Sequence, residues 1–260
     1  MAAPQERVAP AAAPAFRPCV LIPTYNNPMT IRAVVEAARV HLPEVVVIDD
    51  GSDAPGRAAV AAVGADGLAH VHHRARNGGK GAAVKTGFRV ASDLGFSHAL
   101  QVDADGQHDL DDMPRLLAAA RTDPRALVLG APRYDDSAPA ARRHGRKITK
   151  FWTDFETGGP VIEDPMCGFR VYPLADALAV RARGDRMDFD IEIAVRLVWR
   201  GVPVVHVPTE VRYLPAEAGG VSHFQLVRDN VRISLLHARL SMTAIFRRLL
   251  PGARRGAPAT

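Results

Sequence analysis

The sequence predicts an α/β protein built around a central, mostly parallel sheet with helices on both faces. Short runs of β-branched and other apolar residues alternate along the chain with longer segments whose apolar residues recur every three or four positions. Hydrophobic residues make up 47% of the 260 residues, which is enough for one full-sized core. Strands and helices that alternate in this way form parallel sheets with crossover helices on both faces.

The predicted elements follow one another through the first half of the chain. The expected strands cover residues 19–22, 45–48, 70–73, 99–102 and 126–129. The expected helices cover residues 30–40, 56–63, 80–94 and 113–120. The run Val45–Ile48 is the clearest strand, because four β-branched residues in a row suit a strand that is buried on both faces.

Composition and charge narrow the class of protein. Residues 1–16 and 251–260 are rich in Ala and Pro and are predicted to be a disordered leader and tail. The formal net charge of +5 suits partners that carry phosphate, but it does not choose among nucleotides, nucleic acid and anionic lipid. Neither a signal peptide nor a run of roughly 18 apolar residues is apparent, so we expect a cytoplasmic protein. Two cysteines, Cys19 and Cys167, indicate neither a disulfide framework nor a zinc site.

Two carboxylates follow directly on the strand predicted at residues 99–102. Asp103 and Asp105 lie one residue apart, so both can approach one cation, and Gln107 offers a further oxygen. Mg²⁺ and Mn²⁺ prefer oxygen ligands and usually share them with substrate phosphates. Asp and Gly are also common in solvated turns. A second acidic strand end upstream favours the cation site.

That second acidic end is Asp49–Asp53, where a carboxylate can accept hydrogen bonds from a base or from ribose hydroxyls. A plain turn with a helix cap explains it equally well. The glycine-rich run Asn77–Ala83 opens a helix, and Lys80 adds positive charge where backbone N–H groups favour an anion. An ordinary glycine-rich turn is again an equal alternative. In a parallel sheet these clusters fall at the carboxyl edge, where ligands bind.

Basic residues crowd the segment after the strand predicted at residues 126–129. Five cations lie within 15 residues, which in most proteins means a solvated segment. Here they follow a strand end and can also clamp a diphosphate or an acceptor phosphate. They are Arg133, Arg142, Arg143, Arg146 and Lys147.

In this order the motifs resemble those of family 2 glycosyltransferases with a GT-A fold. Within that family the chain looks most like the dolichyl-phosphate mannose synthases and other polyprenyl-phosphate glycosyltransferases. The segments that carry the resemblance are Ile22–Asn26, Val47–Ser52, Asn77–Gly81, Asp103–His108, Asp164–Arg170 and Phe189–Glu192. The resemblance runs from about Cys19 to His223 and implies a GT-A domain over residues 17–223.

The resemblance implies roles for individual residues. The predicted nucleotide site and metal site consist of Pro23, Tyr25, Ile48, Asp50, Lys80 and Ala104 around the nucleotide, and Asp103, Asp105 and Gln107 around Mg²⁺ or Mn²⁺. Arg133 and Arg146 would meet the diphosphate or an acceptor phosphate, as would Thr149. The chain departs from the family pattern at Asn27 and Cys167, where Glu and Ser are usual. It also departs at Gly220–His223, which lacks the usual Lys and Arg.

We therefore expect an enzyme that transfers a sugar from a nucleotide-diphosphate donor to a polyprenyl-phosphate or other lipid-linked acceptor, with inversion. Asp105 would act in catalysis as a ligand of the cation, and the cation together with Arg133 and Arg146 would offset the charge that develops on the leaving diphosphate. A phosphate acceptor needs no strong base, whereas a hydroxyl acceptor does. Asp164 is the candidate base, although a cap before Pro165 explains it equally well. Glu163 and Asp190 are weaker candidates.

A long helix is expected over residues 224–250, because one apolar stripe runs along it. The stripe consists of Val227, Val231, Leu235, Ala238, Met242, Ile245 and Leu249. Such a stripe packs on the sheet or rests on anionic lipid, beside arginines at residues 228, 232, 239, 247 and 248. Phe151 and Trp152 are either a further lipid contact or part of the core. If the helix rests on lipid, the protein is peripheral on the inner face of the cytoplasmic membrane.

Two other functions remain open from the sequence. A sugar-phosphate nucleotidyltransferase also combines a parallel sheet, a glycine-rich loop and Mg²⁺, but its loop usually follows the first strand directly. A basic module that binds RNA or membranes without catalysis is consistent with the charge. Few aromatic residues are interleaved with the basic ones, so we expect no nucleic-acid partner. The sequence leaves the oligomeric state undetermined.

Overall fold

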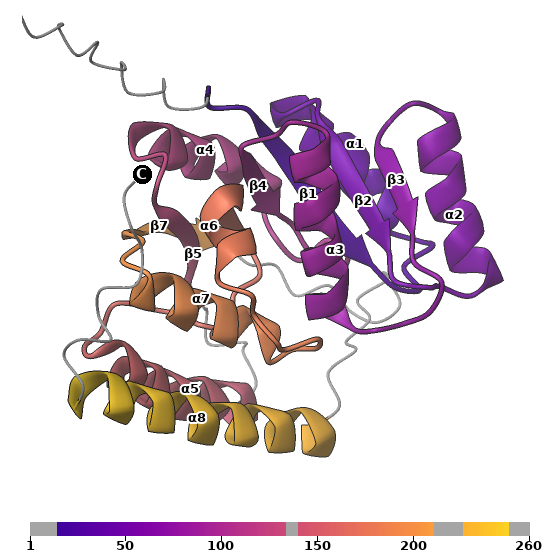
Figure 1. The fold of residues 1–260 in the computed structure, drawn as a ribbon. Helices are drawn as coiled ribbons and strands as arrows, with labels where there is room; N and C mark the ends of the chain where they lie inside the picture. Colours follow the sequence, from indigo (N-terminus) through magenta and orange to yellow (C-terminus); the bar gives the residue numbers. More distant parts are fainter. Residues whose placement is uncertain (1–14, 134–139, 211–225, 250–260) are drawn as a thin grey trace, which may run out of the picture.

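A computed structural model describes residues 15–133, 140–210 and 226–249 of the chain (Figure 1). Its centre is a seven-stranded sheet in the order β3-β2-β1-β4-β6-β5-β7. The strands are β1 (Pro18–Thr24), β2 (Val45–Asp49), β3 (His70–His73), β4 (His98–Gln101), β5 (Leu127–Arg133), β6 (Arg170–Pro173) and β7 (Val204–Glu210). The helices are α1 (Ile31–His41), α2 (Ala54–Ala65), α3 (Lys80–Asp93), α4 (Met113–Thr122), α5 (Ala140–Thr157), α6 (Leu174–Ala179), α7 (Phe189–Trp199) and α8 (Leu226–Leu249), with a 3₁₀ turn at Leu110–Asp112.

The predicted α/β fold is confirmed, and β6 is the one antiparallel strand of the described sheet. It pairs antiparallel with both β4 and β5, while the other strand pairs are parallel. After α5 the chain reaches the carboxyl edge of the sheet, where Arg170 lies opposite Gln101 at the end of β4. A strand that begins at this edge can only run back across the sheet. The alternation of the first half of the sequence gave no indication of this reversal.

Helices cover both faces of the sheet. One core cluster joins residues of α1, α2 and α4 to one set of alternating strand side chains, including Val20, Val47 and Leu100. The opposite cluster joins α3, α6 and α7 to the other set, including Leu21 and Ile48. Successive strand residues therefore point to opposite faces, and both faces are apolar. This explains why the predicted strands are continuous apolar runs rather than alternating ones.

The helices α5 and α8 form an outer layer (Figure 1). They lie side by side, and α7 separates them from the sheet. Ile233, Leu236 and Leu240 of α8 pack on Ile191 and Val195 of α7. The opposite side of α8 is exposed, and that side carries the whole predicted apolar stripe. The C-terminal helix therefore packs on α5 and α7 rather than on the sheet, which corrects one of the two expectations for it.

Several sequence expectations lie outside the described residues. These are most of the leader, the tail from residue 251, and the segment Gly220–His223. Within the described residues, none of the helices is both long enough and apolar enough to cross a bilayer.

Close packing of α3 on β1 requires a glycine in the middle of the helix. A Cβ at Gly87 would approach Leu21 Cδ1 to 2.3 Å, whereas a Cβ at Gly145 in α5 meets nothing within 4 Å. Replacing either glycine by alanine brings a similar gain in helix propensity, so the pair isolates the effect of packing. We predict that Gly87→Ala lowers the free energy of unfolding by about 1–3 kcal/mol in urea denaturation. Gly145→Ala should leave it unchanged or raise it by up to about 1 kcal/mol. Equal effects at both positions would contradict this account of the packing.

Candidate functional site

The candidate site lies at the carboxyl edge of three neighbouring parallel strands, β2, β1 and β4. Each strand ends in one of the polar clusters that the sequence singles out. Tyr25 follows β1 and is half-buried, while Asp50 follows β2 and is almost completely buried. Asp103 and Asp105 follow β4 and are partly exposed. Strand order alone thus brings segments that are 25 to 80 residues apart in sequence to one edge.

Asp50 organises the glycine-rich segment before α3. Its carboxylate accepts hydrogen bonds from the backbone nitrogens of Gly78 (3.1 Å) and Gly79 (2.7 Å), and Arg74 forms an ion pair with it. Burial raises the pKa of Asp50 above its ordinary value, although these three donors act in the opposite direction. A neighbouring glycine is also needed: Gly51 has φ +73°, and a Cβ there would meet the backbone of Arg76 at 2.6 Å. Asp50 therefore fixes the position from which α3 begins.

The loop after β1 is held by a second network of hydrogen bonds, centred on Asn27. Asn27 is buried, and its side-chain oxygen accepts hydrogen bonds from Tyr25 N and Thr24 Oγ1, both at 3.3 Å. Asn26 N donates to Ser52 Oγ at 2.9 Å, which ties this loop to the one after β2. The residue that departs from the family pattern, Asn27, thus serves as a local support for the Tyr25 backbone.

A largely buried ion triad connects the end of β4 to α3 and α7. Lys80 Nζ lies 2.9 Å from the Asp103 carboxylate and 3.0 Å from Asp190 Oδ2. Burial opposes the charge on Lys80, but the two carboxylates outweigh it and raise the pKa of this amine. Burial likewise opposes the charge on Asp103, and Lys80 and His108 together lower the pKa of that carboxyl. Lys80 and Asp103 are consequently both charged at neutral pH.

Asp105 stands in a different environment from Asp103. Its Oδ1 accepts a hydrogen bond from Gln107 N at 3.0 Å. Burial and the nearby charge of Asp103 raise the pKa of Asp105. Ala104, between them, is buried, and its carbonyl accepts a 2.6 Å hydrogen bond from Thr30 Oγ1. The turn is therefore rigid, and its two carboxylates repel each other.

Two further residues close the site around Asp103. A Cβ at Gly168 would approach Asp103 Oδ2 to 2.5 Å and Lys80 Nζ to 2.6 Å, so only glycine leaves room for this ion pair. His108 Nε2 lies 3.7 Å from Asp103 Oδ2, and its ring stacks on Phe169 at 5.0 Å between centroids. The segment Asp164–Arg170 is thus packed directly beside the Asp103 carboxylate.

The structure brings together two residues predicted for the acceptor side, Arg146 and Asp164. Arg146 Nε on α5 lies 3.6 Å from Asp164 Oδ2. Asp164 Oδ1 accepts hydrogen bonds from Met166 N (2.8 Å) and Cys167 N (3.2 Å), which is the capping arrangement before Pro165 that the sequence allowed. Asp164 therefore has a structural role in addition to any chemical one.

The remaining predicted residues lie as follows. Arg133 is exposed at the end of β5, and Thr149 is buried on α5. Pro23 is buried in β1, and the Ile48 side chain is completely buried in the core on the α3 face. The side chain of Ile48 therefore packs in the core, two residues before Asp50.

Sequence reasoning missed some of the side chains that shape this site. Arg74 and Gly168 carried no assignment, and Asp190 was only a minor candidate for a base. Asp190 had a usable signal, since it lies in the Phe189–Glu192 segment of the family resemblance. Arg74 had none, because its contact with Asp50 depends on the pairing of β3 with β2.

Comparison with known proteins now identifies the family. The sequence profile of Glycosyl transferase family 2 matches residues 19–175. The chain is 31% identical over 205 residues to an undecaprenyl-phosphate mannosyltransferase of Micrococcus luteus, covering 74% of this chain and 82% of that protein. It is 32% identical over 209 residues to a polyprenol monophosphomannose synthase of Mycolicibacterium smegmatis, covering 75% and 77%. The chain belongs to glycosyltransferase family 2.

Solved structures agree with this membership at the level of the fold. Glucosyl-3-phosphoglycerate synthase from Mycobacterium tuberculosis, in complex with Mn²⁺, UDP-glucose and phosphoglyceric acid, superposes with a TM-score of 0.59 at 16% identity. The match covers 95% of this chain and 82% of that one. This family 2 member is therefore a glycosyltransferase with the GT-A fold, and the nucleotidyltransferase and the non-catalytic module are no longer needed as interpretations.

The ion triad makes a specific energetic prediction. Replacing Lys80 by Met removes the 3.0 Å ion pair of Asp190, a carboxylate that is 3% exposed. We predict that Lys80→Met lowers the free energy of unfolding by about 3–5 kcal/mol, the range for breaking a buried pair. Adding Asp190→Asn should recover part of this loss, because the two positions are in direct contact.

The measurement is a double-mutant cycle by urea denaturation at pH 7, with Asp190→Asn alone as the fourth corner. If the losses of the two single variants simply add, Lys80 and Asp190 are not energetically coupled, and the triad does not hold α7 to α3.

Proposed function

We propose that this glycosyltransferase moves a hexose from a UDP- or GDP-linked donor to a polyprenyl phosphate, with inversion at the anomeric carbon. The observation that carries the proposal is the agreement between two findings. Relatives named for polyprenyl- or undecaprenyl-phosphate mannose transfer match about three quarters of this chain. The same chain gathers a carboxylate pair, a lysine that is largely buried and a glycine-rich helix start at one sheet edge. Mannose is the sugar named for both relatives, so it is the first to test.

The residues around Asp103 fit a divalent cation. Asp103 and Asp105 offer carboxylate oxygens, the donors that Mg²⁺ and Mn²⁺ prefer, and such ions are usually held by one or two carboxylates plus substrate phosphates. The charge of Asp103 raises the pKa of Asp105, and a bound cation would relieve that repulsion. Within the described residues no group of three or more His, Cys, Asp or Glu side chains is arranged to hold a metal. The donor phosphates would therefore supply the remaining ligands, with Gln107 as a further oxygen.

When bound, the cation would offset negative charge on the diphosphate. The other functions fall to residues of this chain. Lys80 keeps its positive charge beside Asp103, at the start of α3, where backbone N–H groups also favour an anion. Asp50 holds the backbone of Gly78 and Gly79 in position for that role. Together these groups favour a leaving nucleoside diphosphate over an intact donor, which is the requirement for catalysis by charge stabilisation.

The acceptor side of the proposal rests on Arg133, Arg146 and Asp164. A polyprenyl phosphate is already ionised at neutral pH, so its oxygen can attack the anomeric carbon without a general base. Arg146 would pair with that phosphate. Arg133, an exposed cation at the end of β5, would be a second partner for it. Asp164 would serve as a base only for a hydroxyl acceptor. As a carboxylate already bonded to Arg146, it is better suited to orienting that arginine.

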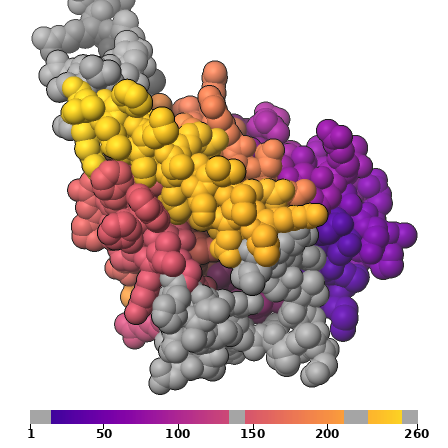
Figure 2. Space-filling model, turned by 90° about the horizontal axis from the view of Figure 1, so that it is seen from below, coloured from indigo at the N-terminus to yellow at the C-terminus, as the bar shows by residue number. Residues whose placement is uncertain are grey.

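A lipid acceptor requires contact with a membrane, and α5 and α8 offer a suitable surface. Eleven of the large hydrophobic residues that the structure exposes lie on these two helices, which form one face in Figure 2. We call this the α5–α8 face. Its apolar residues are Ile148, Phe151, Trp152, Phe155, Val227, Val231, Leu235, Met242, Ile245, Phe246 and Leu249. A soluble protein rarely exposes so large an apolar patch without a partner.

The chemistry of the α5–α8 face favours a lipid bilayer as that partner. Trp and Phe side chains are suited to the interface between headgroups and acyl chains. Arg232 and Arg248 border the apolar stripe and would meet anionic headgroups, as amphipathic interfacial helices do. Arg146 belongs to the same helix as Trp152, so a docked α5 would bring the lipid phosphate and the site together. We therefore propose peripheral binding to the anionic cytoplasmic leaflet.

The metal and donor roles are tested with Asp105→Asn against Asp111→Asn. Asp111 lies six residues further on, with a side chain that is 90% exposed and paired to His41. We predict that Asp105→Asn lowers kcat for sugar transfer to polyprenyl phosphate by at least about 100-fold, the order expected for lost charge stabilisation. Asp111→Asn should keep the wild-type rate.

The assay measures transfer of labelled sugar and release of nucleoside diphosphate, with EDTA treatment and Mn²⁺ add-back. The product is also examined by NMR for the inverted anomer. Full activity of the wild type in EDTA, or of Asp105→Asn with Mn²⁺, contradicts the metal role. Release of inorganic diphosphate instead of nucleoside diphosphate contradicts glycosyl transfer.

The membrane contact is tested with Phe151→Asp/Leu235→Asp, at two positions that are each 66% exposed. The control is Val40→Asp on α1, where the valine is 80% exposed and far from the α5–α8 face in sequence and fold. We predict that the double variant loses at least about tenfold in partition to phosphatidylglycerol vesicles, since one tenfold step corresponds to about 1.4 kcal/mol. Val40→Asp should bind as the wild type does. Wild-type binding by the double variant, measured by cosedimentation, contradicts a lipid role for this face.

A further inference from the structure

The start of α7 connects the donor site to the outer helix α8. Glu192 is completely buried, and its carboxylate accepts four hydrogen bonds. Oε2 accepts from the backbone nitrogens of Arg183 (2.9 Å) and Gly184 (2.6 Å). Oε1 accepts from Arg196 Nε (2.7 Å) and from Arg239 Nη2 of α8 (2.9 Å). One carboxylate therefore holds a loop on one side and an arginine of the α5–α8 pair on the other.

We infer that Glu192, tied to α8 by Arg239, is a positioning residue for the donor-binding segment Asn77–Gly81. The inference rests on the proposed function in one respect, namely that this segment binds the nucleotide. Its structural basis is independent of that function, because it follows from contacts among α3, α7, α8 and the loop of residues 180–188.

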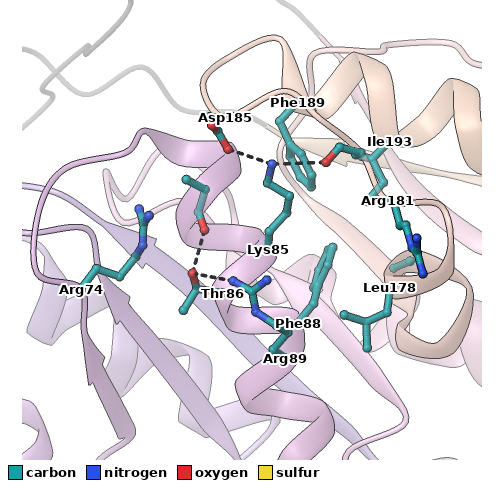
Figure 3. Close-up of a pocket in the computed structure, with 13 residues that line it drawn as sticks. Arg74, Lys85, Thr86, Phe88, Arg89, Leu178, Arg181, Asp185, Phe189 and Ile193 are labelled. Atoms are coloured by element: carbon teal, nitrogen blue, oxygen red, sulfur yellow. Dashed lines mark hydrogen bonds and ion pairs between the residues drawn. The ribbon is translucent and has the colours of Figure 1, made fainter.

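The loop of residues 180–188 lies directly against the start of α3. Asp185 O accepts a 2.9 Å hydrogen bond from Ala82 N, and the Asp185 carboxylate pairs with Lys85 Nζ at 2.8 Å. Figure 3 shows Lys85 and Asp185 facing each other, with the Lys85 amine also donating to a loop carbonyl. A cavity of about 400 Å³ opens between α3 and this loop, next to Lys85 and Asp185. The contact between loop and helix is thus polar and made at several points.

Glycines make this contact close enough to transmit a displacement. A Cβ at Gly79 would meet Asp185 O at 2.6 Å, and a Cβ at Gly81 would meet Phe189 Cβ at 2.3 Å. The backbone of the glycine-rich segment therefore touches the loop and the first residue of α7 without an intervening side chain. A shift of the loop toward α3 must move Gly79–Gly81 as well, because the space between the two backbones is too small to hold even a methyl group.

The first turn of α7 carries two carboxylates that contact different elements of the structure. Asp190 pairs with Lys80 at the donor site, while Glu192 pairs with Arg239 on α8. Hydrogen bonds in which the acceptor is charged are about twice as strong as neutral ones. The charge of Glu192 therefore contributes to holding the Arg183–Gly184 backbone, and Arg239 helps to keep that charge buried. The path from α8 to the nucleotide is Arg239, Glu192, the loop and then Gly79–Gly81.

The test measures nucleotide affinity in the full chain without vesicles. The probes are UDP and GDP with Mn²⁺ in isothermal titration, and the variants are Arg239→Gln, Arg239→Lys and Glu192→Gln. The matched control is Arg200→Gln. Arg200, the C-cap of α7, pairs with Asp176 of α6 at 2.7 Å, and its side chain is 35% exposed, against 43% for Arg239. The control therefore loses an ion pair from an arginine of similar exposure.

We expect Arg239→Gln to raise the Kd for the bound nucleotide about three- to tenfold, the usual size of coupling through a connecting network. The KM for the sugar donor should rise in parallel, with kcat changed less than twofold. The Kd of Arg239→Lys should stay within twofold of the wild-type value. The Kd of Arg200→Gln should also stay within twofold, even if Arg200→Gln and Arg239→Gln lose the same amount of thermal stability. A purely structural pair would lower stability without this selective change in Kd.

Each other outcome counts against a defined part of the inference. Unchanged nucleotide affinity in both Arg239→Gln and Glu192→Gln overturns it. Weaker binding in Glu192→Gln alone overturns the connection to α8. If Glu192→Gln fails to fold, the comparison of Arg239→Gln with Arg200→Gln decides. A wild-type chain that binds neither UDP nor GDP refutes the proposed function itself, and the positioning role with it.

Discussion

The ion triad of Lys80, Asp103 and Asp190 is the interaction on which the arrangement of the site depends. It joins the start of α3 to the end of β4 and to the first turn of α7. A buried charge is tolerated only when it is paired, so these three elements are held together by the cost of separating them. The same lysine leaves Asp103 charged, and that charge in turn raises the pKa of Asp105. Fold and chemistry therefore use one set of side chains.

Glycines permit the close approaches that the triad requires. Gly168 leaves space for the Lys80–Asp103 pair, and Gly81 lets α3 contact Phe189 directly. These positions fill no pocket and carry no charge, yet a methyl group at either would displace a charged or buried neighbour. Because these glycines allow close packing around the carboxylates, short motifs that are widely separated in sequence come together as one site.

The outer pair of helices extends the same architecture toward a partner. α7 packs on the sheet with one side and on the buried side of α8 with the other. Its Asp190 pairs with Lys80 at the donor site, and its Glu192 pairs with Arg239 of α8. The apolar stripe of α8 had two interpretations from the sequence, because a stripe looks the same whether it meets core or lipid. In the structure Ile233, Leu236 and Leu240 fill the buried side, and the stripe that includes Val227 and Leu235 remains exposed.

The sequence by itself determined the fold class, the strands and helices up to residue 129, and the segments that meet at the carboxyl edge. These follow from local signals, since buried parallel strands are short apolar runs and parallel strands share one edge. Only the tertiary structure decided the reversal of β6, the core position of Ile48, the use of Asp190 as a partner of Lys80, and which side of α8 is exposed. Each of these depends on contacts between elements distant in sequence, and periodicity or motif spacing in one chain carries no information about such pairings.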